Sequence, residues 1–228
     1  MEDKSKFVLG EVIVRLLEPH ERERFDELLE QKHYLKSARI GGRSLRYVAE
    51  FNGQWIAIIS FSGAAPNLKS REQWIGWSAQ QRVRRLGFVV NNSRYLLLTD
   101  RQRYPNLGSK VLSLSLKRLS KDWQQAWAQP VLLVESFVDE HLGYEGTCYK
   151  ACGFEAVGLT AGYGRSSRDY YTSHERPKQL YLRALKPGDR GRLAHGRRQL
   201  SGARRLRRQT RRDGRRLLQR RFRNLPPD

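Results

Sequence analysis

The C-terminal part of the chain, residues 186–228, is too basic and too poor in apolar side chains to form a core by itself. It holds 16 Lys and Arg residues against three Asp residues, a net charge of +13 out of +21 for the whole chain. Phe222 is its single aromatic residue, and only a few leucines accompany it. Residues 1–185, which carry the remaining +8, must therefore build the folded domain, and we expect the domain boundary at residue 185.

Length and composition favour one globular domain with this appendage. The chain has 228 residues, of which 39% are hydrophobic. No apolar run approaches the roughly 18 residues that span a bilayer, and the N-terminus lacks the apolar segment of a secretory signal. Cys148 and Cys152 are the only cysteines, too few for a disulfide framework or a four-ligand zinc site. We expect both to be small buried side chains in a cytoplasmic protein without a membrane partner.

The basic residues of the tail are mostly arginines in doublets, an arrangement that favours phosphate groups. The planar guanidinium of Arg binds phosphate oxygens in bidentate fashion. We therefore predict that the tail binds nucleic acid, most simply DNA, through Arg197, Arg198, Arg204, Arg205, Arg207, Arg208, Arg211, Arg212, Arg215 and Arg216. Two alternatives stand: a basic extension without a dedicated ligand, and a membrane-surface segment, which the near absence of Trp and Phe disfavours.

The hairpin signal is the strongest local pattern in the domain. Asn52-Gly53 separates two runs rich in β-branched and aromatic residues, 45–51 and 54–61, and predicts a type I′ turn between two strands. Before it, residues 11–16 alternate as a first strand, and Pro19 opens a helical segment with acidic residues in its first turn.

The remaining expected elements alternate between helices and strands. They are a helix over residues 67–86, short strands over 88–90 and 95–99, a long helix from Asn106 or Ser109 to about Trp127, a buried strand over 131–138, a helix over 146–152 that Gly153 ends, and strands over 154–161 and 179–185. This order mixes a hairpin with strand–helix–strand units. It therefore predicts an α+β fold, a mixed sheet with helices on its faces.

Three segments resemble the GNAT acyltransferase superfamily. Residues 149–154 (Tyr-Lys-Ala-Cys-Gly-Phe) have the Tyr-x-x-x-Gly-Phe form of its last helix. Residues 95–138 look like its strand–loop–helix–strand core, and residues 103–109 (Arg-Tyr-Pro-Asn-Leu-Gly-Ser) are similar to its loop pattern (Gln/Arg)-x-x-Gly-x-(Gly/Ala). The resemblance implies a GNAT-like central mixed sheet with flanking helices, and acyl-CoA as the cofactor.

More narrowly, residues 15–185 resemble the DruA-like family, typified by a component of the bacterial Druantia antiphage defence system. The resembling segments are Trp74-Ile-Gly-Trp77, Val90-Asn-Asn-Ser-Arg94, Pro105-Asn-Leu-Gly-Ser109, Phe137-Val-Asp139 and Gly146-Thr-Cys-Tyr149. Relatives of this family also occur beside transposases in mobile elements. The resemblance implies a setting in antiphage defence or in a mobile element rather than a particular reaction.

The candidate cofactor site is the loop before the long helix. In the superfamily, backbone N–H groups at this helix N-terminus meet a pyrophosphate. Here Asn106 replaces the first glycine, and Pro105 contributes no N–H, so the predicted site is poorer by one donor. The candidate acyl-CoA-binding residues are Asn106, Gly108, Ser109 and Lys110. A nucleic-acid phosphate at the same loop, or a simple N-cap and turn, are the alternatives.

Glu135, Asp139 and Tyr149 are the candidate catalytic residues. The resemblance implies that Tyr149 protonates the leaving thiolate, with core packing as the alternative. Glu135 and Asp139 lie four residues apart along one strand, so we expect them to point to the same face. A carboxylate in an apolar strand is costly unless it is hydrogen-bonded, so Glu135 is either a general base or the buried partner of an Arg. The first hypothesis predicts that Glu135→Gln abolishes activity and spares folding.

Trp74 and Trp77 are candidate nucleic-acid contacts in the domain itself. They are one helical turn apart and have arginines nearby, so both could line one groove and stack on a base. Packing in the core is the default alternative for such residues. The histidines show no metal-ligand spacing.

Three hypotheses for function follow. The first is a nucleic-acid-binding protein of a defence or mobile-element system that modifies, processes or simply binds nucleic acid on a GNAT-like scaffold. The second is an acyl-CoA-dependent N-acyltransferase. The third is a non-catalytic scaffold subunit whose basic tail docks a helicase, a transposase or an RNA-containing partner.

Overall fold

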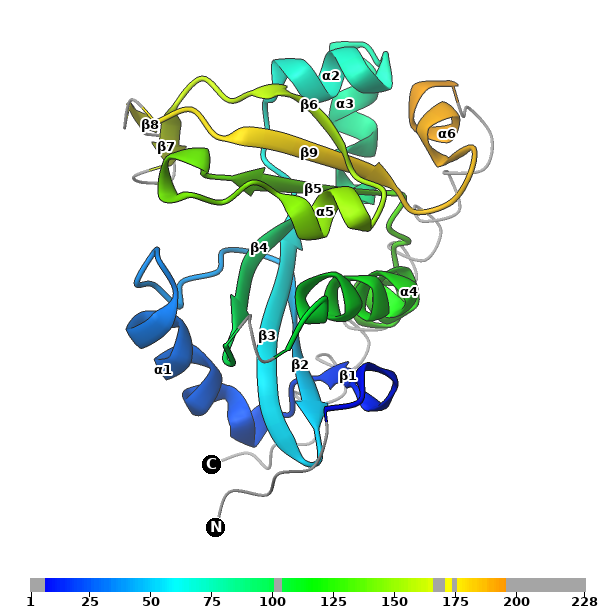
Figure 1. The fold of residues 1–228 in the computed structure, drawn as a ribbon. Coiled ribbons are helices and arrows are strands. Elements are labelled where there is room, and N and C mark those ends of the chain that lie inside the picture. Colours follow the sequence, from blue (N-terminus) through cyan, green and yellow to red (C-terminus); the bar gives the residue numbers. More distant parts are fainter. Residues whose placement is uncertain (1–6, 101–103, 166–170, 174–175, 196–228) are drawn as a thin grey trace, which may run out of the picture.

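A seven-stranded mixed sheet forms the centre of the computed structural model, which describes residues 7–100, 104–165, 171–173 and 176–195 (Figure 1). Its strand order is β1-β2-β3-β4-β5-β9-β6, and every neighbouring pair is antiparallel except β4 and β5. The strands of this sheet are β1 (Ile13–Leu16), β2 (Ser44–Phe51), β3 (Gln54–Gly63), β4 (Val89–Leu97), β5 (Leu133–Val138), β6 (Glu155–Leu159) and β9 (Gln179–Ala184). The strands β7 (Tyr163–Arg165) and β8 (Tyr171–Ser173) form a separate pair. The helices are η1 (Leu9–Glu11), η2 (Pro19–Glu21), α1 (Arg22–Lys32), α2 (Lys69–Ile75), α3 (Ala79–Arg85), η3 (Leu86–Phe88), α4 (Leu107–Trp127), η4 (Glu140–Leu142), α5 (Thr147–Ala151) and α6 (Asp189–His195). The predicted α+β fold is confirmed.

The predicted hairpin is present. β2 and β3 are antiparallel, and Asn52 and Gly53 between them have φ values of 51° and 73°. A type I′ turn requires this positive φ at both central residues. The helical segment expected at Pro19 is also present, as a 3₁₀ turn that leads directly into α1.

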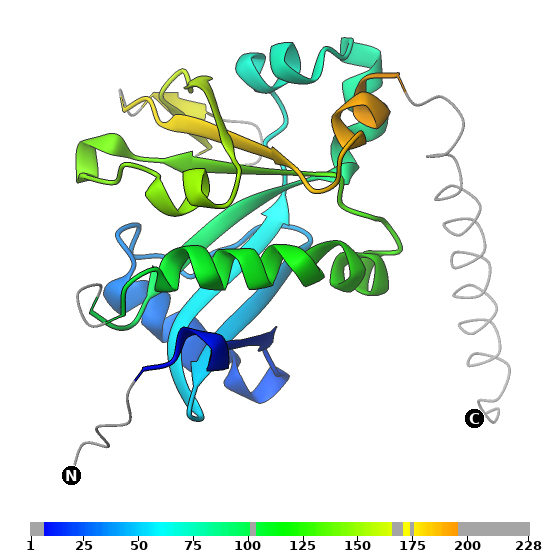
Figure 2. The same cartoon turned by 45° about the vertical axis from the view of Figure 1, so that its right-hand side comes forward.

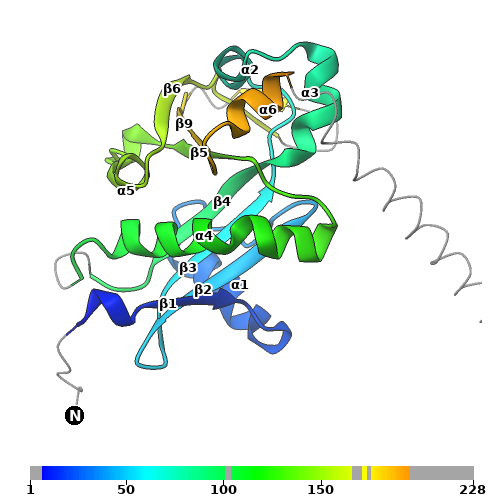
Figure 3. The same ribbon diagram turned by 90° about the vertical axis from the view of Figure 1, so that its right-hand side faces the viewer.

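Different helices cover the two halves of the sheet. On the β1–β4 half, Phe25 and Leu29 of α1 pack against one face, whereas Leu112 and Trp123 of α4 pack against the other (Figure 2). On the β5–β9–β6 half, α2, α3 and α6 gather on one face, and α5 lies on the face that α4 also covers (Figure 3). One core lies under α4 and α5 and continues across both halves of the sheet, whereas the opposite face has two separate cores, one under α1 and one under α2 and α6.

The helix predicted over residues 67–86 is two helices. α2 ends at Gly76, which has a φ of 79° and closes the helix in the left-handed conformation that glycine adopts most easily. Ser78 is the N-cap of α3. Its side chain accepts a hydrogen bond from the Gln81 N–H, and the Gln81 side chain accepts one from the Ser78 N–H. The single-helix prediction was wrong because the apolar spacing continues through these two capping signals.

β4 is one strand, where the sequence predicted two. The polar run at residues 91–94 separates the two apolar stretches that were expected as strands. It stays in the sheet because β3 pairs with Asn91, Asn92 and Arg94, while β5 pairs only with Asn91 of this run.

Two further elements lie where a loop and a tail were predicted. β7 pairs with β8 inside the expected loop of residues 162–178. α6 follows the expected domain boundary at residue 185, and its Leu193 and Ala194 are buried in the core under α2. The Gln81 side chain also donates to the Ala194 carbonyl (2.9 Å). The folded domain therefore continues through His195, and residues 196–228 of the predicted tail lie outside the described residues.

A fully buried ion pair fixes the connection from β3 to α2. Arg71 and Glu135 are each 0% exposed, and Arg71 Nη1 donates to Glu135 Oε2 at 2.7 Å. The same nitrogen donates to the Ala65 carbonyl (2.8 Å), and Glu135 Oε1 accepts from the Ala65 N–H (2.8 Å). Burial raises the pKa of Glu135, and the Arg71 charge opposes that rise. The pair thus ties α2 to the β5 strand.

We predict that Glu135→Gln destabilises the fold, since it leaves the buried Arg71 charge without its counter-ion. Breaking one partner of a buried pair costs about 3–5 kcal/mol, to be measured as the free energy of unfolding in urea. The matched control is Glu72→Gln, which breaks the partly exposed pair of Glu72 with Arg82 (2.8 Å). That change should cost less than about 1 kcal/mol.

The double substitution Arg71→Met with Glu135→Leu removes both charges, and it should recover most of the stability that the single change loses. Equal stability of Glu135→Gln and Glu72→Gln would contradict a structural role for the buried pair.

Candidate active site

A cavity of about 530 Å³ lies where β4 and β5 separate. These two strands are paired only through residues 89–91 and 133–135. Beyond that point, residues 92–97 and 136–139 line opposite sides of the cavity. Figure 1 shows the cause: β5 and β9 run across the direction of β2 and β3, so the sheet opens between its halves. The first turn of α4 and residues 144–149 complete the wall.

A β-bulge in β4 forms one side of this cavity. The register between β3 and β4 shifts after Ser60, which pairs with Arg94, because Phe61 pairs with Asn92 and Ser93 is left over. The Asn92 side chain supports the bulge, since Nδ2 donates to the carbonyl groups of Ser60 (2.9 Å) and Arg94 (3.2 Å). Its Oδ1 remains to accept a hydrogen bond from across the cavity.

Tyr149 donates that hydrogen bond. Its hydroxyl lies 2.7 Å from Asn92 Oδ1, so a residue of α5 is fixed to the bulge of β4. The Tyr149 ring stacks on Tyr181 (centroids 5.8 Å apart) and meets Phe154 edge-on. Burial raises the pKa of Tyr149 well above its ordinary value of 10. The hydroxyl therefore carries its proton at physiological pH, in a side chain that both packs and lines the cavity.

The first turn of α4 lines one part of the cavity. Asn106, Gly108 and Ser109 line it, whereas Lys110 is not part of the lining. Asn106 has a φ of 60°, so it adopts the left-handed conformation that a glycine at this position would favour. Neither of the two predicted N-cap side chains caps α4. The Asn106 side chain makes no capping hydrogen bond, and the Ser109 hydroxyl donates instead to the Asn106 carbonyl (3.0 Å). Tyr95 donates to the Gly108 carbonyl (2.5 Å) and steadies the turn.

The structure does not bring the two predicted carboxylates together. Asp139 lies just beyond β5 and lines the cavity; it is 5% exposed, and its Oδ1 has no hydrogen-bond partner among the described residues. Glu135 points instead into the core on the other side of the sheet, where it binds Arg71. The Arg-partner alternative for Glu135 is therefore the one that the geometry matches, and Asp139 lies beyond the last residue of β5, so the alternation of side chains along the strand does not extend to it.

Several residues that line the cavity were not among the candidate site residues that the sequence predicted. Asn92 and Tyr95 come from β4, and His33 and Tyr34 follow α1. Burial lowers the pKa of His33 to about 4, so its ring is neutral, and its Nδ1 accepts from the Leu35 N–H (3.2 Å). Nδ1 is therefore occupied, and the remaining ring nitrogen carries the proton. Asn92 lies in the family-resembling segment of residues 90–94, and that segment could have indicated it.

The two tryptophans are engaged within the domain. Trp77 is 7% exposed and packs in the core with Ile75, the alternative of core packing. Trp74 is partly buried; its indole N–H donates to Glu155 (2.9 Å), and the Arg190 guanidinium lies 4.4 Å from its ring centroid. All ten predicted nucleic-acid-binding arginines lie outside the described residues.

Two classes of feature are absent from the part of the chain that the structure describes. It holds no group of three or more His, Cys, Asp or Glu side chains that could bind a metal ion. Among the same residues, no helix is both long and apolar enough to pass through a membrane.

Solved structures that match this chain include acetyltransferases. The aminoglycoside acetyltransferase AAC(6')-Ib in complex with coenzyme A and kanamycin is 18% identical with a TM-score of 0.51, over 79% of this chain and 99% of that one. The same enzyme with paromomycin and acetyl-CoA gives 17% and 0.50, over 76% and 93%. Spermidine N-acetyltransferase from Vibrio cholerae gives 8% and 0.48, over 77% and 96%. At this level of identity the likeness concerns the fold, and the predicted GNAT-like architecture is confirmed.

A family model gives the more specific match. No curated protein matches the sequence. The model described as Druantia protein DruA matches residues 4–194, which include both halves of the sheet and α6 up to its last residue but one. The chain therefore belongs to the DruA family, as its sequence motifs predicted.

Proposed function

We propose that the domain is an acyl-CoA-dependent N-acyltransferase. The observation that carries this proposal is that the first turn of α4 and Tyr149 line one cavity, which lies in the opening between β4 and β5. Acyl transfer from a coenzyme A thioester needs two groups at opposite ends of one site: one that binds the anionic part of the cofactor and one that donates a proton. The AAC(6')-Ib structures of the same fold hold coenzyme A or acetyl-CoA, which supports the proposal.

The first turn of α4 fits the pyrophosphate of coenzyme A. The first N–H groups of a helix have no partner within the helix, and its dipole favours an anion there. Gly108 has no side chain to fill the approach, and Asn106 keeps the left-handed backbone despite replacing a glycine. Pro105 removes one donor, so the residues that would hold the pyrophosphate are Gly108 and Ser109, with Asn106 shaping the turn.

Tyr149 is placed to finish the reaction. Acetyl-CoA supplies a thioester, whose carbon–sulfur bond breaks as the amine nitrogen forms its bond to the carbonyl carbon. The Tyr149 hydroxyl gives its proton to the sulfur, the attacking nitrogen loses one proton to solvent, and Tyr149 regains one proton from solvent, so that amide, thiol and the protonated tyrosine result. The raised pKa of Tyr149 keeps this proton in place until negative charge develops on sulfur. Asn92 holds the hydroxyl on the cavity side of β4.

We predict that acetyl-CoA raises the melting temperature, and that Tyr149→Phe preserves this rise while losing turnover. Ligand at 100 times its Kd adds about 2.7 kcal/mol of stability, or roughly 5–10 °C for a domain of this size. Loss of the proton donor should lower kcat about 10²–10⁴-fold, measured by chromatography of coenzyme A released with 1,4-diaminobutane as the probe acceptor. The control is Tyr47→Phe, whose hydroxyl binds Asp122 under α4 (3.1 Å).

That control should leave kcat unchanged, because Tyr47 does not line the cavity. An absent thermal response to acetyl-CoA, or full turnover by Tyr149→Phe, would contradict the proposal.

A second proposed function is nucleic-acid binding by the arginine doublets. It rests on the charge of +13 in residues 186–228, which exceeds the +8 of the rest of the chain. Arg is suited to phosphate, and six to ten contacts would make affinity fall by about 10³–10⁵ between 50 and 200 mM salt. In the antiphage or mobile-element setting that family resemblance implies, such a tail would bring the acyltransferase domain to DNA, or dock a nucleic-acid-bearing helicase or transposase.

We predict that deleting residues 196–228 abolishes salt-dependent DNA binding and leaves the acetyl-CoA thermal shift intact. The deletion starts after α6 because Leu193 and Ala194 belong to the core. The measurement is the mobility of a duplex DNA probe in a salt series, with RNA of equal length for comparison. Equal binding by the full and shortened chains would overturn the role of the tail.

A further inference from the structure

The cavity is lined by a buried carboxylate, Asp139, and by two tyrosines, of which Tyr34 interacts electrostatically with that carboxylate. Asp139 is 5% exposed, lines the cavity and has an Oδ1 without a hydrogen-bond partner among the described residues. Tyr34, which follows α1, and Tyr144, which precedes α5, line the same region with ring centroids 5.9 Å apart. A carboxylate with aromatic faces beside it attracts a cation, since charge pairing and the ring quadrupoles act together.

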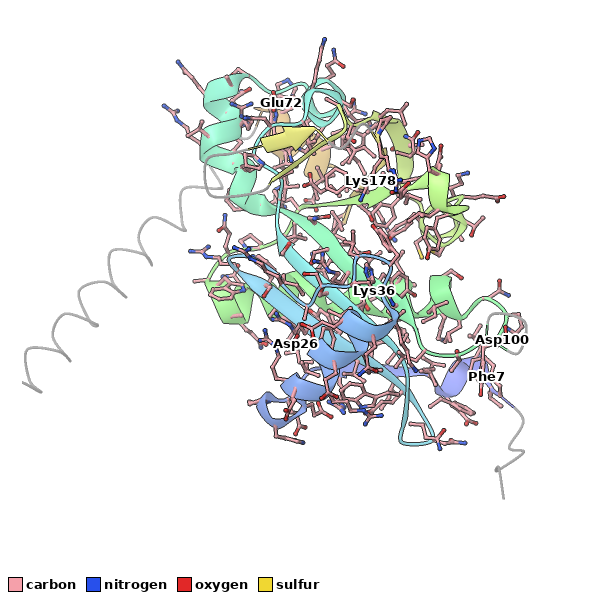
Figure 4. The ribbon with its side chains drawn as sticks, turned by 90° about the vertical axis from the view of Figure 1, so that its left-hand side faces the viewer. Phe7, Asp26, Lys36, Glu72, Asp100 and Lys178 are labelled. Carbon is pink, nitrogen blue, oxygen red and sulfur yellow. The ribbon has the colours of Figure 1, made fainter. Side chains whose placement is uncertain are left out.

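A lysine already lies against this group. Lys178 Nζ is 5.4 Å from the Tyr34 ring centroid (Lys178 is labelled in Figure 4). Its backbone is fixed by two hydrogen bonds with Thr160: the Lys178 N–H donates to the Thr160 hydroxyl, and the Thr160 N–H donates to the Lys178 carbonyl, both at 2.9 Å. Lys178 is thus held against the Tyr34 ring, where burial lowers its pKa and the nearby Asp139 carboxylate opposes that shift.

The other charged groups nearby are either engaged or exposed. The Arg94 guanidinium donates to three carbonyl groups, those of Ser37 (3.0 Å), Ser93 (2.7 Å) and Arg39 (2.9 Å). Lys32 and Glu145 line the cavity but are exposed to solvent. Asp139 is therefore the buried carboxylate of the cavity that still has an unpaired oxygen among the described residues.

We propose that Tyr34, Tyr144 and Asp139 form an ammonium-binding site for the acceptor, and that Lys178 occupies it when no acceptor is bound. The inference rests on the proposed acyl transfer for its purpose, but the site itself requires only a cation. We call these three residues the ammonium site.

The chemistry of the site also indicates the class of acceptor. A nitrogen held as an ammonium ion against a carboxylate has its lone pair on a proton, so it cannot attack a thioester. The nitrogen that reacts near Tyr149 must therefore be a second one. The acceptor is a linear diamine or polyamine, with one charged nitrogen in the ammonium site and a neutral one directed toward Tyr149.

The test uses 1,4-diaminobutane, titrated calorimetrically into the full chain at neutral pH and low salt. We expect binding of the diamine and none of the neutral isostere 1,4-butanediol. Asp139→Asn keeps the shape and removes the charge, so it should weaken binding at least about tenfold. Lys178→Met removes the tethered competitor and should strengthen binding severalfold.

Lys32→Met is the matched control, since it removes one positive charge from the same cavity without touching the Tyr34 ring. It should change diamine affinity by less than twofold, which separates displacement of Lys178 from a general charge effect. Tyr34→Leu should also weaken binding, and because Tyr34 is exposed this variant serves if Asp139→Asn does not fold.

Binding by Asp139→Asn or Tyr34→Leu equal to that of the unmodified chain, or weaker binding by Lys178→Met, would overturn the inference. The acetyl-CoA thermal shift, measured on the same samples, separates the two proposals. If acetyl-CoA raises the melting temperature but the diamine does not bind, the ammonium site is contradicted and the acyl-CoA site is not. If the diamine binds but acetyl-CoA has no effect, only the proposed acyl transfer is contradicted.

Discussion

The parting of β4 and β5 is the constraint on which the site depends. Two parallel strands normally continue to exchange hydrogen bonds along their length. Here their register covers three residue pairs, after which the halves of the sheet take different directions. Polar backbone that leaves a sheet needs other partners, and Asn92 meets part of that need at the bulge. The cavity is therefore built by the sheet itself, with helices only completing its wall.

Two polar arrangements hold the halves of the sheet in this relation, and they lie on opposite faces. On the cavity side, the hydrogen bond from Tyr149 to Asn92 joins α5 to β4. On the far side, Arg71 and Glu135 join α2 to β5 within the core. The first has a hydroxyl beside open space and can take part in chemistry. The second has no exposed surface, so its role is to hold elements together.

The sequence predicted those parts of the fold that depend on local signals. Asn52-Gly53 defined a hairpin, and the apolar repeat of residues 107–127 defined α4, because turn geometry and helical spacing are local properties. The family motifs named Tyr149, Gly108 and Ser109, and all three line the cavity. The direction of Glu135 was not predictable, because it depends on Arg71, which lies 64 residues earlier in the chain.

The residues of the proposed ammonium site were likewise not predictable from the sequence. Tyr34, Tyr144 and Lys178 come from three separate segments, and none belongs to a motif. Their proximity follows from how α1, the loop before α5 and the start of β9 pack around the open sheet. The unpaired oxygen of Asp139 likewise appears only once its neighbours are placed. Sequence patterns thus named the residues of the proposed acyl-CoA site, whereas those of the proposed ammonium site depend on tertiary structure.

Hydrogen–deuterium exchange with and without acetyl-CoA tests the central claim most directly, namely that the opening between β4 and β5 is an acyl-CoA site. The account predicts slower exchange in peptides that cover residues 92–97, 106–110 and 144–149, with α2, α3 and α6 unchanged. Unaltered exchange in these segments at saturating acetyl-CoA, or protection confined to the face that α2, α3 and α6 cover, would contradict it.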